Sequence, residues 1–171
     1  MTEHIDWRAL ALQLGTLTKG GEFGGSNQAR EALEVLLGED NLRAAVDYYI
    51  SGRPGSELTR SVLWYLRPWS AMKYCYDIYV SGRCIDSRRA AVELLRVVAD
   101  ERAVGWVAEF LEDEDADIQS WGGGLLDQLI FSGQVDADDV EELISRAEAH
   151  ANPIVRDRAE VIRADMDRRR A

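Results

Sequence analysis

The chain has 171 residues, enough for one domain with a substantial core, and its 46% hydrophobic and 30% charged residues are typical of a folded chain. No apolar run approaches the roughly 20 residues that a membrane-spanning helix needs, and the first residues form neither a basic leader nor a continuous apolar segment. We therefore expect a cytoplasmic protein that does not bind membranes. Its two cysteines, Cys75 and Cys84, are expected to stay reduced.

The net charge of −11 is unevenly distributed. Residues 97–149 hold fifteen acidic and only two basic residues, whereas residues 43–96 hold five acidic and nine basic ones. A section this acidic would attract a basic protein surface and repel nucleic acid, so we expect no nucleic-acid partner. The alternative interpretation is an ordinary solvated face that keeps the protein soluble.

The chain begins with a helix predicted over residues 3–14, with Ile5, Leu10 and Leu14 turned inward. Residues 15–25 contain five glycines and predict a loop. Ser26 is then predicted to cap the next helix. The buried stripe of that helix is expected to consist of Ala29, Ala32, Leu33 and Leu36.

From this point the sequence repeats itself. The segment RAAVDYYISGR at 43–53 returns as KYCYDIYVSGR at 73–83, a shift of 30 residues. The glycine in each repeat suits the left-handed residue that often closes a helix. A period near 30 with two helices per unit is the pattern of an α-solenoid. The predicted helix pairs are 26–37 with 40–51, 56–66 with 70–81, 86–98 with 101–112, and 116–131 with 137–149, followed by a terminal helix at 153–168.

The clearest repeat spans Ile85 to Leu129, and its order of residues resembles the HEAT repeat. That pattern runs roughly D..VR..A...L...D..A...L...L.D.D..VR..A...L. The residues that match it are Asp86, Arg88, Ala91, Leu95, Asp100, Ala103, Val104, Leu111, Asp113, Asp115, Ile118 and Leu126. The resemblance implies an all-α fold, a right-handed α-α superhelix of about four helix pairs plus capping helices.

On this basis residues 1–171 form a single HEAT-like domain. Its N-terminal helix and glycine-rich connector cover 1–25, the helical hairpins 26–151, and the C-terminal capping helix 152–171. The three glycines at 122–124 lie inside a predicted helix, where each costs up to about 1 kcal/mol relative to alanine. We expect another backbone to approach them closely, with an adjacent repeat favoured over a bound partner.

The sequence holds no recognisable catalytic constellation. His4 and His150 lie near opposite ends of the chain, and neither belongs to a metal-binding or nucleophile-activating motif. The acidic run at 113–117 lacks the glycine and the closing glutamate of a calcium loop, and it is better interpreted as a turn and a helix N-terminus. We therefore expect a protein that is not an enzyme and has no catalytic residue, metal site or cofactor.

Surface recognition is the remaining class of function. Tyr48 and Tyr74 fall outside the apolar stripes of their helices, and Trp106 flanks the stripe of its own, so these rings are candidates either for an interface or for packing. Asp47 and Asp77 occupy equivalent positions and predict a polar ladder on the second helices, or simple ion pairs within each helix. The candidate partner-binding residues are Asp47, Tyr48, Lys73, Tyr74, Asp77, Trp106, Glu109, Glu112, Asp113, Glu114 and Asp115.

A small, acidic, HEAT-like protein also resembles some bacterial immunity proteins that neutralise secreted toxins. This resemblance implies a partner protein with a basic surface, such as a toxin domain that acts on nucleic acid. The alternatives are an adaptor or assembly chaperone, which would use the same kind of surface, and a HEAT-like nucleic-acid glycosylase or lyase, which would need a basic or cofactor-lined groove.

Overall fold

The computed structural model describes residues 4–170. Apart from a two-stranded hairpin, its regular elements are helices, which confirms the predicted all-α class. No helix among these residues is long and apolar enough to cross a membrane. The elements in chain order are α1 (Trp7–Gln13), β1 (Leu17–Thr18), β2 (Gly21–Glu22), α2 (Ser26–Leu37), α3 (Glu39–Ile50), α4 (Ser56–Leu66), α5 (Trp69–Val80), α6 (Ile85–Val98), η1 (Glu101–Trp106), α7 (Val107–Leu111), α8 (Ala116–Phe131), η2 (Ala137–Val140), α9 (Glu141–Glu148) and α10 (Pro153–Arg170).

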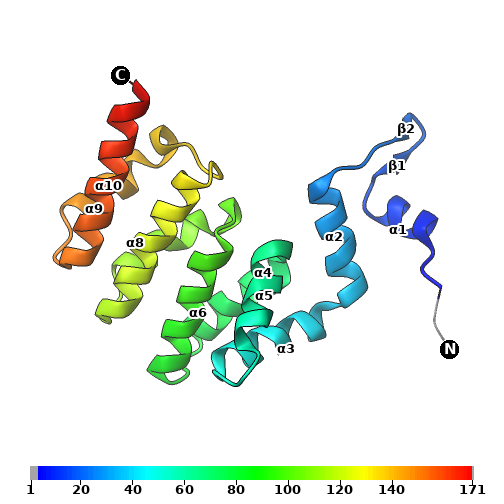
Figure 1. Ribbon diagram of the computed structural model, residues 1–171, viewed down its shortest axis with the longest axis horizontal. Coiled ribbons are helices and arrows are strands. Elements are labelled where there is room, and N and C mark those ends of the chain that lie inside the picture. The colour runs from blue at the N-terminus through cyan, green and yellow to red at the C-terminus, as the bar shows by residue number, and fades with distance from the viewer. Residues whose placement is uncertain (1–3, 171) are drawn as a thin grey trace.

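The helices stand side by side in a row, with α1 and α10 at opposite ends (Figure 1). Within the row α4, α6, α8 and α10 follow one another, and α3, α5, α7 and α9 pack alongside them. Helix α6 packs closely on α8, and the second helix of each predicted pair also packs on the first helix of the next: α3 on α4, α5 on α6, α7 on α8, and α9 on α10. The predicted helix bounds agree with the structure to within two residues for α2 to α6 and α8.

Two of the predicted second helices are divided. The segment expected at 101–112 starts as the 3-10 helix η1 and continues as α7, and the segment expected at 137–149 starts as η2 and continues as α9. In both cases an aspartate opens the first turn, because the side chains of Asp100 and Asp136 accept hydrogen bonds from backbone amides two residues later. The right-handed sense of the superhelix stays a prediction.

The core runs continuously from α3 to α10. Its largest fully buried side chains include Leu63, Met72, Leu94, Phe110 and Leu129, one from each of five successive helices. This continuity is what a stacked helical array requires, since no single pair can bury its own apolar stripe. Both cysteines are free; Cys75 is buried in the core, whereas Cys84 is exposed at the start of α6.

The three glycines at 122–124 lie in α8, where neighbouring helices approach it. A Cβ atom on the first glycine would lie 2.6 Å from the Cβ of Phe110 in α7. On the second it would lie 3.5 Å from Cγ1 of Val155 in α10, and on the third 2.7 Å from Cδ of Arg96 in α6. The predicted close approach of a neighbouring backbone is therefore found at Gly122, which meets α7, whereas Gly124 makes room for a side chain and Gly123 makes ordinary contacts.

The N-terminal part departs from prediction. Helix α1 begins at Trp7, capped by the side chain of Asp6, and Ile5 is exposed. A short antiparallel hairpin, with Leu17 opposite Glu22, replaces part of the expected loop. Helix α2 begins after Gly25, so Ser26 is its first residue and not its cap.

The predicted buried stripe of α2 is wrong as well, because α2 has no buried residue. Every later first helix packs on a preceding second helix that spans eleven or twelve residues when its 3-10 turn is included, but α2 has only the seven-residue α1 before it. The apolar spacing in residues 70–81 predicts that Met72, Tyr76, Tyr79 and Val80 point inward. Met72 and Tyr79 are buried, but Val80 is exposed, and Cys75 and Ile78 are buried instead. Helix α5 contacts both α3 and α6, which rotates its buried face away from Val80.

Candidate protein-binding surface

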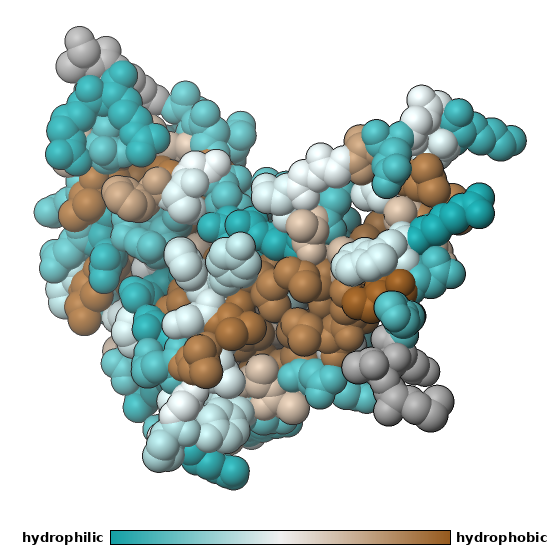
Figure 2. Space-filling view, turned by 45° about the vertical axis from the view of Figure 1, so that its right-hand side comes forward, coloured by the Kyte–Doolittle hydropathy of each residue, from teal (hydrophilic) through white to brown (hydrophobic). Residues whose placement is uncertain are grey.

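Exposed apolar side chains gather on the N-terminal part of the molecule. Of the eighteen large hydrophobic residues that are exposed in the described chain, thirteen lie between residues 5 and 65. Figure 2, which turns the N-terminal part of the molecule forward, shows a broad apolar field on this face. We call the members on or next to α1, the hairpin and α2, together with those on one face of α4, the N-terminal apolar surface: Ile5, Trp7, Leu12, Phe23, Leu33, Val35, Leu36, Leu37, Leu58, Val62 and Tyr65. Large exposed apolar patches on folded chains often mark interaction sites.

The two sides of α2 explain why its leucines are exposed. Gln28, Ala29 and Ala32 face α1 across a cavity of about 230 Å³. The opposite side, which includes Arg30 and Glu34, faces the body of the protein. The helix is therefore held to the body by polar contacts, while the short α1 covers only the N-terminal half of its apolar side.

Glu34 is the main polar link between α2 and the body. Helix α5 starts after Pro68, which offers no side-chain cap. The carboxylate of Glu34 takes that role from outside the helix, because it accepts hydrogen bonds from the backbone amides of Trp69 (3.1 Å) and Ser70 (2.9 Å) and from the hydroxyl of Ser70 (2.6 Å). A carboxylate at this position also interacts favourably with the positive end of the helix dipole.

Replacing this carboxylate should loosen α2. We expect Glu34→Ala to lower the free energy of unfolding by about 1–2 kcal/mol, the usual cost of losing a helix cap. Hydrogen exchange at the amides of Trp69 and Ser70 should accelerate, and urea unfolding gives the free energy. Glu31→Ala is the matched control on the same helix and should change stability by less than about 0.5 kcal/mol. Equal effects of the two substitutions would contradict the capping role.

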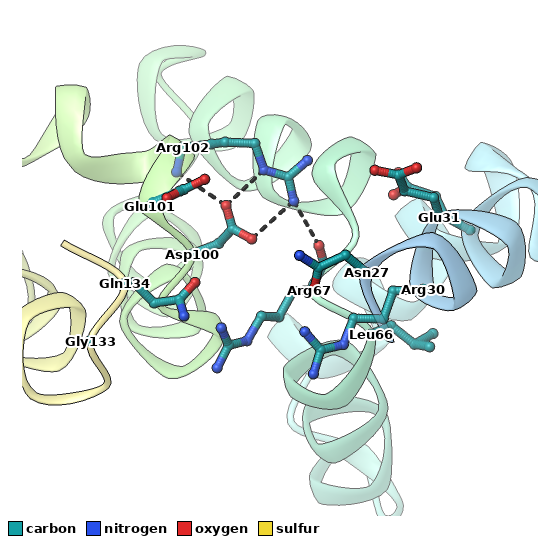
Figure 3. A pocket seen from close by; sticks show the side chains of 11 residues that line it. Asn27, Arg30, Glu31, Leu66, Arg67, Asp100, Glu101, Arg102, Gly133 and Gln134 are labelled. Atoms are coloured by element: carbon teal, nitrogen blue, oxygen red, sulfur yellow. Dashed lines mark hydrogen bonds and ion pairs between the residues drawn. The ribbon is translucent and has the colours of Figure 1, made fainter. Parts of the chain in front are cut away.

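Beside Glu34 lies a polar hollow of about 360 Å³ between α2, the end of α4 and the start of η1 (Figure 3). Arg102 donates to Asp100 from Nε (2.7 Å) and from a terminal nitrogen (3.0 Å), and it also donates to the backbone carbonyl of Arg67 (3.1 Å). Burial alone would raise the pKa of Asp100, but hydrogen bonds from Arg102 outweigh it and lower that pKa. The hollow therefore contains the Arg102–Asp100 ion pair, and Arg102 connects this pair to the turn between α4 and α5 through the carbonyl of Arg67.

The predicted polar ladder on the second helices exists in a different form. Asp47 on α3 accepts hydrogen bonds from the hydroxyl of Tyr74 on α5 (3.0 and 3.1 Å) and pairs with Arg83 (3.3 Å). Arg83 also donates to the hydroxyl of Tyr74 (3.0 Å). Asp47, Tyr74 and Arg83 thus form one exposed network that connects α3 to α5.

The other members of the predicted ladder interact locally. Lys73 pairs with Asp77 one turn later at 3.1 Å. Tyr48 is just exposed, and its hydroxyl donates to the carbonyl of Pro54 (2.6 Å). Exposed pairs such as Lys73–Asp77 contribute little stability, so these side chains are available to a partner.

Trp106 lies in a stack of aromatic rings. Its ring is 5.5 Å from that of Trp69 and 4.6 Å from that of Tyr76, nearly parallel to both. The guanidinium group of Arg102 lies 5.2 Å from the Trp69 ring and extends the stack. Tyr76 donates to Glu109 (2.7 Å), and this hydrogen bond raises the pKa of Tyr76. All three rings are partly buried, so Trp106 combines a packing role with an exposed edge.

Most of the predicted acidic patch is engaged within the chain. Asp113 pairs with Arg88 (2.6 Å), and Asp115 pairs with Arg89 (2.7 Å); both aspartate side chains are largely buried. Glu112 pairs with Arg146. Glu114 is exposed, and no hydrogen bond or ion pair to it exists among residues 4–170. The acidic excess of the sequence therefore overstates the charge that a partner would meet.

The Arg89–Asp115 pair should make the stability of the protein depend on pH. Hydrogen bonds from Arg89 lower the pKa of Asp115, so the ionised carboxylate stabilises the fold above the pKa of the unfolded chain, and this contribution is lost as the pH falls through the lowered folded value. Asp115→Asn should lower the urea midpoint at neutral pH, and its deficit relative to the wild type should vanish in acid. Arg89→Gln should give the same profile. A deficit that does not change with pH would contradict the assignment.

The histidines have different surroundings. Nε2 of His150 lies 2.8 Å from the carbonyl oxygen of Leu111, and its Nδ1 accepts a hydrogen bond from the backbone amide of Asn152 (3.0 Å). His150 therefore stabilises the turn before α10. His4 is exposed at the other end of the chain. Among residues 4–170 no three His, Cys, Asp or Glu side chains are grouped to hold a metal ion.

Comparisons with protein-family models, with curated proteins and with solved structures found no match to this chain. Its relation to HEAT repeats therefore stays a prediction from the resemblance of residues 85–129.

Proposed function

We propose that this chain is a non-catalytic protein-binding module. The N-terminal apolar surface carries the proposal, because α2 presents Leu33, Leu36 and Leu37 on one face with about two-fifths of each residue exposed. Helices of globular proteins bury such a stripe, and an amphipathic helix left open is suited to receive an apolar partner surface. The candidate site thus extends from α2 over α4, and α3, which contacts both helices, carries Asp47 of the Asp47–Tyr74–Arg83 network.

We propose further that the partner is a bacterial toxin domain with a basic surface, which this chain inhibits in the cytoplasm. The net charge of −11 supports a basic partner, since it would accelerate association even where individual carboxylates are paired within the chain. Buried aromatic and aliphatic contacts would then hold the complex. An adaptor or assembly chaperone is the second candidate, because the same apolar surface would suit a partner that is not a toxin.

A co-expression experiment tests the proposal. The product of the adjacent gene is expressed alone and together with this chain, and growth is measured. An immunity protein restores growth and co-purifies with the toxic product in a defined stoichiometry. Co-purification without any toxicity of the partner would favour an adaptor. Toxicity that this chain does not relieve, with no complex formed, would contradict the inhibitor proposal.

A further inference from the structure

A second site lies on α4, α6 and α8, where a groove of about 360 Å³ is lined by Arg60, Ser61, Trp64, Arg96, Val97 and Gln128. We call it the arginine groove. Its central feature is Arg96, whose side chain crosses from α6 to α8. Cδ of Arg96 occupies the space beside Gly124, where a Cβ atom would be only 2.7 Å away, and its guanidinium group lies 5.1 Å from the centre of the Trp121 ring. Gly124 weakens helix α8, but because it has no Cβ it leaves the space that the Arg96 side chain occupies.

Arg96 differs from the other arginines that connect neighbouring helices. Arg88 and Arg89 on the same helix reach Asp113 and Asp115 at 2.6 and 2.7 Å, and Arg158 reaches Asp127 at 3.3 Å. Within residues 4–170 no carboxylate lies within ion-pair distance of Arg96, and its acidic neighbour Glu93 on the same helix interacts with it only through the longer-range attraction of their charges. The Nε atom of Arg96 is buried and has no hydrogen-bond acceptor.

Arg60, on the α4 side of the groove, also has a buried Nε atom without an acceptor. Its terminal nitrogens reach Glu57 (3.2 Å) and Glu93 (3.6 Å). Glu93 is itself engaged, because it accepts a hydrogen bond from the hydroxyl of Tyr49. Leaving buried donors without an acceptor costs free energy, and an unseen bound group is a standard explanation of such atoms.

We propose that the arginine groove binds an anionic group, a carboxylate or a phosphate. Arg96 and Arg60 receive its oxygens, as guanidinium groups do with both kinds of anion. Trp64, which is 53% exposed, provides a flat apolar wall beside them, and Gln128 offers an amide. Two sources supply such a group, an acidic side chain of a protein and free phosphate, and the experiment below separates them. The site itself does not depend on the function proposed above.

Nuclear magnetic resonance of the arginine Nε–H groups in the full chain tests this proposal. The protein is titrated separately with inorganic phosphate and with N-acetyl-glutamate amide, at constant ionic strength maintained with chloride. We expect saturable shifts of the Arg96 and Arg60 resonances at millimolar ligand. Tighter binding of the glutamate derivative would indicate a protein side chain as the natural ligand, and tighter binding of phosphate a phosphate group.

Three variants make the test specific. Arg96→Gln should weaken binding about tenfold or more, since it removes a charge-assisted contact. Gly124→Ala keeps every charge but displaces Arg96 Cδ, and it should also weaken binding. Arg53→Gln changes an exposed arginine that does not line the groove, and it should leave binding unchanged. Shifts spread equally over all arginines, no saturation with either ligand, or unchanged binding in both Arg96→Gln and Gly124→Ala would overturn the proposal.

Discussion

Phe110→Ala is expected to lower the free energy of unfolding by about 3–5 kcal/mol, the usual cost of deleting a buried phenylalanine. Phe110 has no exposed surface, and its ring meets that of Tyr79 edge to face at 4.8 Å. It also lies where α7 crosses the glycines of α8. The substitution would open a cavity between α5, α7 and α8, and the close backbone contact with α8 would prevent the site from collapsing.

A second phenylalanine provides the matched control. Phe131, at the end of α8, is 72% exposed, so Phe131→Ala should change stability by less than about 0.5 kcal/mol. Urea unfolding of the two variants, followed by far-ultraviolet circular dichroism, gives the comparison. Similar losses in both variants would show that the array does not depend on the α7–α8 contact.

Gly122→Ala is expected to destabilise the protein by about 1–3 kcal/mol, although alanine favours a helix by up to about 1 kcal/mol. The reason is steric: the added Cβ would lie 2.6 Å from the Cβ of Phe110 and 3.4 Å from its backbone carbonyl carbon. A Cβ next to a backbone cannot move aside as the end of a flexible side chain can. The two helices would have to separate, which weakens every contact along them.

The neighbouring glycine should behave in the opposite way. A Cβ on Gly123 would make ordinary contacts of 3.5–3.6 Å with Val155, so Gly123→Ala should be neutral or stabilise the protein by up to about 1 kcal/mol. Thermal unfolding of the two single variants separates helix propensity from close approach. Stabilisation by both substitutions would disprove the close packing of α7 on α8.

The sequence predicted the helices well because the signals for them are local. Helical spacing of apolar residues and glycines such as Gly52 and Gly82, both with positive φ, mark where each helix ends. The glycines at 122–124 were informative for a related reason, since they weaken the helix that holds them and call for a compensating contact. Such features can be recognised without knowing which helices become neighbours.

Features that depend on tertiary neighbours could not be predicted in this way. The stripe of α2 looks buried in the sequence, but α1 is too short to cover it, so Leu33 and Leu36 became part of the candidate site. The acidic run looked free, but Arg88 and Arg89, some 25 residues earlier, pair with Asp113 and Asp115. Helical periodicity cannot show which side chains of different repeats meet.

We propose that recognition lies on the exposed N-terminal helices, whereas the helices that follow provide stability. The helices from α3 to α10 bury a continuous core, but α2 and one face of α4 keep apolar side chains in contact with water. Such surface is unfavourable unless something covers it. A partner that covers it would bury Leu36 and Val62 together with the exposed ring of Tyr65.

The most direct test is the dissociation constant of the complex with the product of the adjacent gene, measured by calorimetry. The double variant Leu36→Ser, Val62→Ser changes two side chains that are about two-fifths exposed, so it should spare the fold and weaken binding about a hundredfold. Val161→Ser on α10, at the far end of the row and 57% exposed, should bind as the wild type does. An unchanged constant in the double variant, or an equal loss in Val161→Ser, would contradict binding through the N-terminal apolar surface.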